Sequence, residues 1–340
     1  MKRRIEWVDL SKFVGIFAMV WGHSGVNENM DIIIHAFHMP LFFFLSGYLY
    51  KDGRIKKKAK TLLIPYFVFG IGLFLLWKAI SKIIILPVYY GIPELIRGLF
   101  YDNAVLSPYA GIQWFLTCLF LTEVIFYIIK KCVKRERYII LALVLFSLIG
   151  FVYPMLTVKR LFWALDCAFT AIVFYGAGFI VSSHKISISE FLKKTWVKTV
   201  VVLVLAFMAI AATYLNGYVN MRTMQYGNYF LYYISAFSII ALIMLFTKSI
   251  SQIGAIRSSI IYKGILYIGQ NTLIVLVMNQ FFNQLFGWYV KPYMHVYVAH
   301  PYITDFVFAI IMLILMIPVS YIIQRFFPFV LGKPIKKGKK

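Results

Sequence analysis

Apolar residues are distributed along the chain in ten long stretches separated by short polar segments. Each stretch is about as long as the roughly 20 residues that an α-helix needs to cross about 30 Å of hydrocarbon. The stretches are too long and too uniform for the strands of a membrane barrel, whereas a helix satisfies its own backbone hydrogen bonds in lipid. The pattern predicts an all-α integral membrane protein, a bundle of about ten transmembrane helices, over residues 11–27, 31–50, 61–82, 112–129, 138–156, 161–182, 199–215, 229–247, 264–286 and 302–323.

The composition agrees with a lipid environment. Of the 340 residues, 62% are hydrophobic and 14% are charged, whereas an ordinary soluble domain is about 45 to 50% apolar and about 25% charged. No polar block or Pro/Gly/Ser-rich linker long enough for a second domain interrupts the apolar stretches. We therefore expect one transmembrane domain over residues 1–340, with a basic tail at 324–340, in a multi-pass protein of the cell membrane.

The net charge of +23 carries information about orientation. If the N-terminus is cytoplasmic, 28 of the 35 Lys and Arg residues fall on the cytoplasmic side, in segments 1–12, 51–60, 130–137, 184–198, 248–263 and 324–340. This bias agrees with the positive-inside rule, and an even number of helices returns the chain to the side on which it starts. Both termini are therefore expected in the cytoplasm. The basic loops would also attract anionic membrane lipids. They are short and scattered and match no nucleic-acid-binding module, so we expect no nucleic-acid partner.

Several common motifs are missing from the sequence. It has no Walker loop, no dinucleotide-binding fingerprint and no HExxH pair, and its three cysteines lack the spacing of a zinc site. Nucleotide hydrolysis and zinc proteolysis therefore lose their usual support.

Three histidines are grouped near the outer end of the first two predicted helices. Lys12 and His23 are eleven residues apart, which is about three turns and about 16 Å of rise, so they lie on nearly the same helix face. His35 and His38 share a face of the returning helix because they are spaced i, i+3. Imidazole titrates near neutrality and can take a proton from a hydroxyl that attacks an acyl group. Ordinary packing and a zinc site remain alternatives for these rings.

Other polar or small residues inside the apolar stretches are also candidates for a role. Glu123 is a candidate for orienting or balancing a catalytic imidazole, because an intramembrane carboxylate usually faces a partner or a wet cavity. An ion pair with a basic inner segment, such as Lys130 at the end of the same helix, is the alternative. Ser46 and Gly47 could serve only as a small-residue contact that lets two helices approach closely.

Three segments of the chain carry a family resemblance. The chain begins EWVDLSKFVGIFAMVWGH, continues FHMPLFFFLSGYLY, and then has a basic loop that ends KKKAKTLLIPY. Together these segments resemble the integral-membrane acyltransferase family 3, whose members include O-acetyltransferases of surface polysaccharides. In that family a basic residue precedes a catalytic histidine by ten intervening residues, and Lys12 and His23 hold those places. The family's FFxxSGF pattern and its tryptophan motif are matched by Phe42, Phe43, Ser46, Gly47 and Tyr48, and by Gln113 to Leu116.

The chain departs from the family at two positions. Lys12 stands where arginine is commoner, and a lysine cannot offer a bidentate fork to a phosphate or carboxylate. Some relatives have a glutamate five residues after the motif tryptophan, but here that position is Leu119 and the nearest carboxylate is Glu123.

The resemblance implies an O-acyltransferase of the bacterial plasma membrane. Acetyl-CoA or another acyl-CoA would be the donor substrate, with no permanently bound cofactor and no metal, and the acceptor would be a hydroxyl of a cell-surface glycan. A separate chain could complete the transfer. A transporter or exporter of a polysaccharide or lipid-linked sugar is the alternative. In the enzyme, the implied catalytic residues are His23, Lys12 and Glu123; the implied substrate-binding residues are His35, His38, Ser46, Gln113 and Trp114; and the implied coenzyme-binding residues are Arg54, Lys57 and Lys58.

Overall fold

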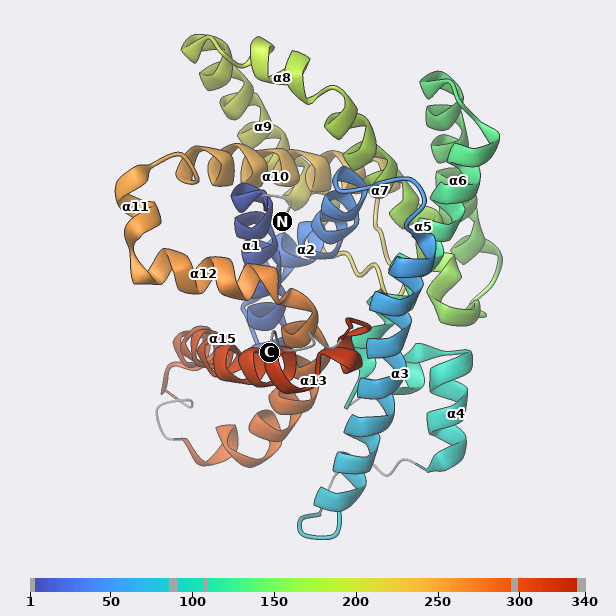
Figure 1. Ribbon diagram of the computed structural model, residues 1–340, viewed down its shortest axis with the longest axis vertical. Coiled ribbons are helices and arrows are strands. Elements are labelled where there is room, and N and C mark those ends of the chain that lie inside the picture. The colour runs from blue at the N-terminus through green and yellow to red at the C-terminus, as the bar shows by residue number, and fades with distance from the viewer. Residues whose placement is uncertain (1–3, 86–90, 107–108, 295–298, 335–340) are drawn as a thin grey trace, which may run out of the picture.

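The computed structural model describes residues 4–85, 91–106, 109–294 and 299–334, and in these ranges the regular elements are helices (Figure 1). The long helices are α1 (Glu6–Ser24), α2 (Glu28–Tyr48), α3 (Ile55–Ile80), α5 (Trp114–Cys132), α6 (Glu136–Leu156), α7 (Leu165–Ser183), α9 (Thr195–Asn216), α10 (Tyr229–Ile250), α13 (Thr272–Tyr289) and α15 (Pro301–Phe326). Shorter helices are α4 (Ile92–Phe100), α8 (Lys185–Phe191), α11 (Gly254–Ser258) and α12 (Ile260–Gln270), and the 3-10 turns are η1 (Asn103–Leu106), η2 (Gly111–Gln113), η3 (Phe162–Ala164), η4 (Lys291–Tyr293) and η5 (Pro328–Leu331).

The helices confirm the predicted all-α membrane bundle. In the described ranges, nine of them are long and apolar enough to cross a membrane. Each predicted stretch except 264–286 coincides with one long helix, and α1 is the long helix that is not among the nine. Its hydropathy is lowered by polar residues that include Asp9, Lys12 and His23. The charged start of this helix must therefore be covered by protein or by water.

The prediction of one continuous helix over residues 264–286 is wrong. The chain breaks at Asn271, between α12 and α13, where φ is −121°. The Asn271 side chain donates a hydrogen bond to the carbonyl of Tyr267, and its backbone N–H turns to Ile268 instead. A side chain that competes for the carbonyl four residues earlier is a known cause of a helix end.

Burial separates central helices from peripheral ones. About two thirds of the apolar windows of α2 and α5 are buried, against 11% of the window of α9. Large apolar side chains such as Leu203, Phe207 and Leu215 are exposed along α9. A helix that is apolar on its exposed side needs lipid around it, so this arrangement agrees with a membrane-embedded bundle.

Two glycines bring α2 and α7 into close contact. A Cβ atom on Gly47 would lie 1.8 Å from the carbonyl oxygen of Tyr175, and one on Gly178 would lie 2.0 Å from that of Phe44. The two helices can therefore touch through their backbones only because these positions lack side chains. Gly47 has the small-residue contact role that we considered for the Ser46–Gly47 pair, and Ser46 beside it is half-buried.

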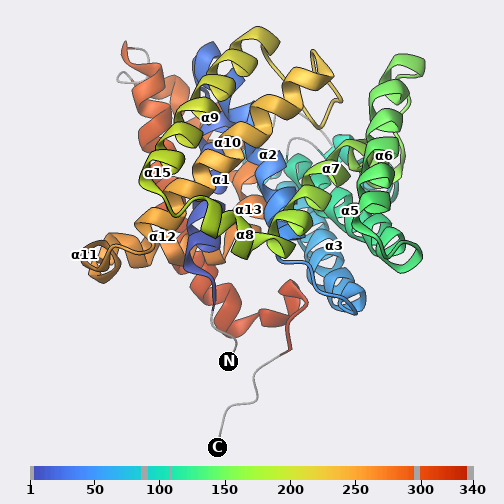
Figure 2. The ribbon, with the colours of Figure 1, turned by 90° about the horizontal axis from the view of Figure 1, so that it is seen from above.

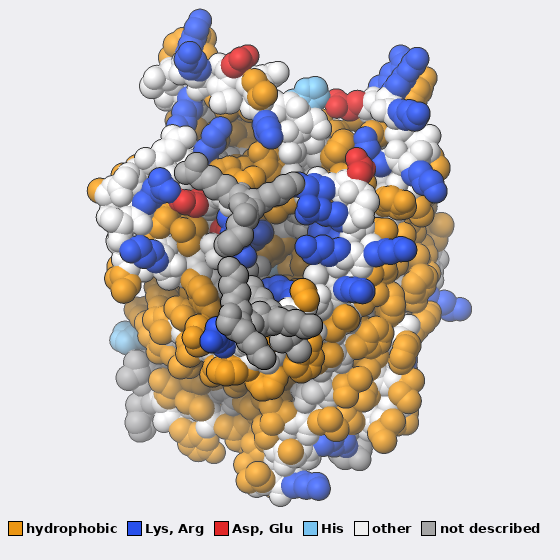
Figure 3. Space-filling view, in the orientation of Figure 1, with side chains coloured by type: hydrophobic (Ala, Val, Ile, Leu, Met, Phe, Trp, Pro, Cys, Tyr) orange, Lys and Arg blue, Asp and Glu red, His pale blue; other side chains and the backbone are white. Residues whose placement is uncertain are grey.

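The first and last parts of the described chain lie on the same face of the bundle, which we call the terminus-bearing face (Figure 2). Lys and Arg side chains gather on this face, over the connection between α2 and α3 and around α6 (Figure 3). The first part of the predicted basic tail returns to α3, because Gly332, with φ +63°, lies against the carbonyl of Lys60. Residues 335–340 of that tail lie outside the described residues.

Candidate active site

The rings of three histidines lie together where α1 ends and α2 begins. The ring centroids of His23 and His35 are 6.3 Å apart, those of His23 and His38 are 6.4 Å apart, and those of His35 and His38 are 5.1 Å apart. The adjacency of the two helices and the i, i+3 spacing on α2 produce this grouping. The three side chains therefore form one cluster, which we call the histidine cluster.

Each ring of the histidine cluster is held through the same nitrogen. Nδ1 of His23 lies 2.8 Å from the carbonyl oxygen of Met19, and Nδ1 of His38 lies 2.7 Å from that of Ile34. Nδ1 of His35 lies 3.1 Å from the carbonyl oxygen of Asp31 and 2.8 Å from its carboxylate. Carbonyls and carboxylates only accept hydrogen bonds, so each Nδ1 must carry the proton and each neutral ring has its lone pair at Nε2.

Exposure increases across the histidine cluster. His38 is buried, the His35 side chain is 15% exposed, and His23 is exposed. His23 is thus the ring of the histidine cluster that is most accessible to a molecule entering the site from the protein surface. A proton acceptor must be within hydrogen-bond reach of its substrate, so His23 is the member best placed for that contact.

The segment between α9 and α10 borders the cluster. The ring of Tyr218 lies 5.1 Å from that of His35. An isolated bridge between Asn220 and Gln225 shapes this segment, and Arg160 donates a 2.5 Å hydrogen bond to the carbonyl of Arg222. The segment between α9 and α10 therefore contacts the histidine cluster through Tyr218 and the segment before α7 through Arg222.

Arg160 also forms a buried ion pair with Asp166 at the start of α7. Its Nε and Nη2 donate to the two carboxylate oxygens at 2.7 and 2.9 Å, and the Asp166 side chain is fully buried. Burial alone would lower the pKa of the Arg160 guanidinium, but the Asp166 hydrogen bonds raise it above its ordinary value. The paired charges lock the segment before α7 in place.

Two amides of α13 face the end of α1. Asn283 donates a hydrogen bond to the carbonyl of His23, and Asn279, one turn earlier, places Nδ2 at 3.7 Å from the sulfur of Met19. Asn279 is 1% exposed, and its Oδ1 has no hydrogen-bond partner among the described residues. These two asparagines were not predicted as site residues, although polar residues at i, i+4 in an apolar helix were a usable signal.

An ion pair from the last third of the chain covers the end of α1. Lys291 pairs with Asp305 and donates to the carbonyl of Ser24. A cation at the C-terminal end of a helix satisfies carbonyls that have no partner within the helix. The end of α1 that bears His23 is thus fixed by α13, η4 and α15.

Lys12 lies at the other end of α1. Its Nζ is 3.3 Å from Asp9, one turn earlier, and the Lys12 side chain is 25% exposed. The carbonyl of Asp9 is covered by α12, where a Cβ on Gly269 would come within 1.9 Å of it. Lys12 therefore shares a helix with His23 but takes part in a separate charge pair.

Glu123 contacts none of the three rings of the histidine cluster. Its carboxylate pairs with Lys58 of α3 and accepts a hydrogen bond from Tyr175 of α7. The expectation that Glu123 orients a catalytic imidazole is corrected accordingly. Our alternative, an ion pair, describes it better, but the partner is Lys58 instead of Lys130, whose Nζ lies 4.7 Å from the ring centroid of Phe179.

The implied coenzyme-binding residues lie at the terminus-bearing face. Arg54 and Lys57 are exposed, while Lys58 is partly covered by its contact with Glu123. A cavity of about 40 Å³ lies between Arg54, Lys58, Glu123 and Tyr175, which is room for about one water molecule. Arg54 and Lys57 are therefore accessible to a coenzyme, whereas the cavity beside them is too small to admit its acyl group.

Gln113 and Trp114 lie at the start of α5. Gln113, the last residue of η2, is fully buried where η2 contacts α13, and neither of its amide atoms has a hydrogen-bond partner in the described part of the chain. Trp114 is buried and lines a small pocket with Arg160 and Arg222. An unpaired buried amide costs about 1 to 3 kcal/mol, so Gln113 is a candidate for contact with a substrate.

Among the described residues, no group of three or more His, Cys, Asp or Glu side chains is arranged to hold a metal ion.

A model of the acyltransferase 3 family, described as an acyltransferase domain, matches residues 5–325. Comparisons with curated proteins and with solved structures found no match.

Proposed function

The chain belongs to acyltransferase family 3, and we propose that it is a membrane-bound O-acyltransferase. It moves an acyl group, acetyl first among the candidates, from cytoplasmic acyl-CoA to a hydroxyl of a cell-surface glycan. Both termini lie in the cytoplasm in this proposal, and the membrane is the bacterial plasma membrane. The basic face that carries both termini supports this orientation (Figure 3).

The observation that carries the proposal is the histidine cluster. Three imidazoles, each with Nδ1 bound to an oxygen atom, leave three Nε2 lone pairs free at one site. Such a group suits the deprotonation of an alcohol, a step that a general base accelerates by about 10² to 10⁴.

His23 is the general base in this mechanism. Its Nε2 takes the proton of the acceptor hydroxyl while that oxygen attacks the carbonyl carbon of the thioester. The new C–O bond forms, the C–S bond breaks, and the coenzyme thiolate takes the proton back from the imidazolium. His35 and His38 hydrogen-bond the acceptor or the developing oxyanion. The buried amides of Gln113 and Asn279, whose oxygens have no hydrogen-bond partner among the described residues, are further candidates for contact with the acceptor.

The donor approaches from the terminus-bearing face. Arg54, Lys57 and Lys58 attract the phosphates of the coenzyme there. The acyl group, still bound to the coenzyme as a thioester, then has to reach about 16 Å along α1, from the level of Lys12 to that of His23. Opening this route requires a rearrangement near the Lys58–Glu123 pair, because the cavity between them is small. Ser46 and Trp114 are further candidates for contact with the substrate.

The test compares two histidine variants in proteoliposomes supplied with labelled acetyl-CoA and candidate glycans. His23→Gln is expected to lower label transfer to the glycan by about 10² to 10⁴. His184→Gln is the matched control, because His184 is exposed and pairs with Glu136 instead. Transfer by correctly inserted His23→Gln protein at the wild-type rate would exclude His23 as the base.

The same experiment separates the enzyme from a transporter or exporter of a polysaccharide or lipid-linked sugar. The break between α12 and α13 is the feature that favours transport, since discontinuous helices form substrate sites in many transporters. Movement of unmodified glycan across the membrane, with no label on it, would support the carrier.

A further inference from the structure

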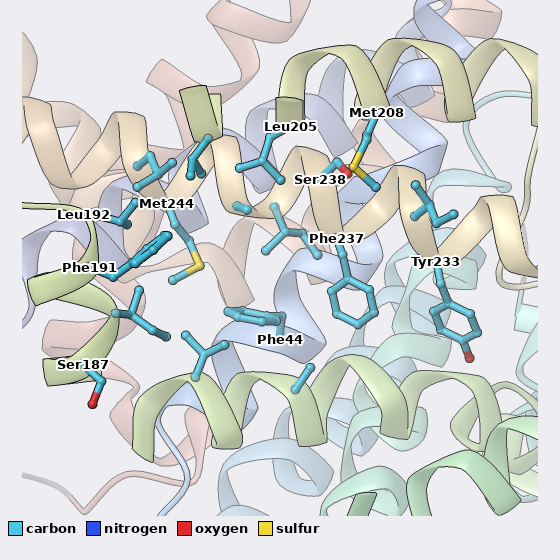
Figure 4. A pocket seen from close by; sticks show the side chains of 18 of the residues that line it. Phe44, Ser187, Phe191, Leu192, Leu205, Met208, Tyr233, Phe237, Ser238 and Met244 are labelled. Carbon is cyan, nitrogen blue, oxygen red and sulfur yellow. The ribbon is translucent and has the colours of Figure 1, made fainter. Parts of the chain in front are cut away.

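A large apolar cavity lies apart from the histidine cluster, between α7 on one side and α9 and α10 on the other. Its volume is about 810 Å³, and its lining is almost wholly apolar. Figure 4 shows side chains from several helices pointing into it, with Phe191 of α8 and the following Leu192 at one end and Tyr233 of α10 toward the other. Phe44 of α2 contributes to the lining, so the cavity reaches inward as far as a central helix.

The cavity is long enough to receive a hydrocarbon chain. Along α10 its lining runs from Phe230 to Leu245, a distance of about 22 Å at 1.5 Å per residue. This exceeds half the thickness of the roughly 30 Å hydrocarbon layer. The helices that form it are among the membrane spans, so it opens toward lipid tails.

A second, basic pocket continues the cavity at its α8 end. It has a volume of about 220 Å³ and shares Leu192 and Leu245 with the apolar cavity. Three lysines line it, Lys193, Lys198 and Lys248. The half-buried Lys198 donates a 3.0 Å hydrogen bond to Ser249, which holds its ammonium group in the pocket.

The apolar cavity and the basic pocket thus adjoin and form a single site. We propose that this site binds one anionic phospholipid from the leaflet on the terminus-bearing side. The phosphate lies among Lys193, Lys198 and Lys248, and an acyl chain enters the apolar cavity. Basic pockets between membrane helices bind anionic headgroups by point-charge attraction, and the apolar cavity supplies the contact that a free phosphate would lack.

The binding test uses the full chain purified in detergent, titrated with phosphatidylglycerol or with phosphatidylcholine of the same acyl chains. Native mass spectrometry measures the bound lipid. Lys198→Gln/Lys248→Gln is expected to weaken phosphatidylglycerol binding by about thirty-fold, since each lysine near a headgroup contributes roughly a factor of five. Lys131→Gln/Lys134→Gln is the matched control, because both lysines are exposed, Lys131 at the end of α5 and Lys134 just after it, outside the pocket lining.

Three outcomes would overturn the proposal: equal affinity for the two lipids, no effect of the pocket substitutions, or displacement of phosphatidylglycerol by millimolar inorganic phosphate. A second variant, Leu205→Trp, fills the apolar cavity without touching the lysines. It is expected to weaken binding while leaving the preference for the anionic headgroup intact. Unchanged binding by this variant would contradict the placement of the acyl chain.

Discussion

The ion pair between Lys58 and Glu123 makes a prediction about the stability of the bundle, because its two members differ in exposure. The Glu123 side chain is 4% exposed, whereas that of Lys58 is 32% exposed. Lys58→Met therefore leaves a carboxylate buried without its cation. Glu123→Gln leaves an ammonium group that can turn toward water, and the new amide can still bond to Tyr175.

Breaking a buried ion pair by removing one partner costs about 3 to 5 kcal/mol. We expect a loss of that size in the free energy of unfolding for Lys58→Met. The Glu123→Gln variant loses a charged hydrogen bond, part of which water replaces, so we expect about 1 to 2 kcal/mol. The double variant Lys58→Met/Glu123→Gln should be more stable than Lys58→Met alone, because it no longer buries an unpaired charge.

Unfolding of the purified chain in mixed micelles, followed by tryptophan fluorescence, measures the four proteins of this double-mutant cycle. The exposed neighbour Lys57→Met is the control, with an expected change within about 0.5 kcal/mol. Equal losses from the two single variants, or a loss below about 1 kcal/mol for Lys58→Met, would mean that the Glu123 carboxylate is hydrated in the native state. In the transfer assay, Lys58→Met should raise KM for acetyl-CoA, whereas Glu123→Gln, which releases Lys58, should not.

Two further predictions concern positions where the packing leaves little freedom. Overpacking typically costs about 1 to 3 kcal/mol, and Gly178→Ala should destabilise the bundle by at least that much, since the new methyl group meets a backbone carbonyl. Gly72 has open space around it, so Gly72→Ala should stabilise the bundle by about 0.5 to 1 kcal/mol in the same unfolding assay. Arg160→Lys loses the bidentate contact with the buried Asp166 and should lower both the free energy of unfolding and the transfer rate. The control Arg97→Lys, at an exposed position, should change neither measurably. Equal behaviour of the two variants would contradict a role of Arg160 in positioning the segment before α7.

The elements could be predicted well because lipid imposes a simple local rule. Each apolar stretch had to be helical, so nine of the ten ranges read from hydropathy each coincide with one long helix. The grouping of His23 with His35 and His38 could also be expected, because a short turn between antiparallel helices and an i, i+3 spacing are local features.

Contacts between distant parts of the chain could not be predicted in this way. The partner of Glu123 is 65 residues away, and Asn283 meets the carbonyl of His23 across 260 residues. Such pairs depend on how helices pack, and hydropathy does not contain that information. The break at Asn271 was missed because the apolar pattern continues through it, while the competing hydrogen bond comes from a single side chain.

The shared tautomer of the histidine cluster restricts what the site can bind. With all three Nδ1 protons committed to oxygen atoms on α1 and α2, the neutral rings offer only acceptors at Nε2, and they cannot hydrogen-bond to one another. A molecule that enters between rings 5.1 to 6.4 Å apart must therefore bring a donor. A sugar hydroxyl brings one and gains a base in the same contact. A carboxylate brings none, and would bind only if a ring were first protonated. Competition experiments should accordingly find that neutral polyols inhibit transfer at neutral pH, whereas carboxylates of similar size inhibit it only as the pH falls.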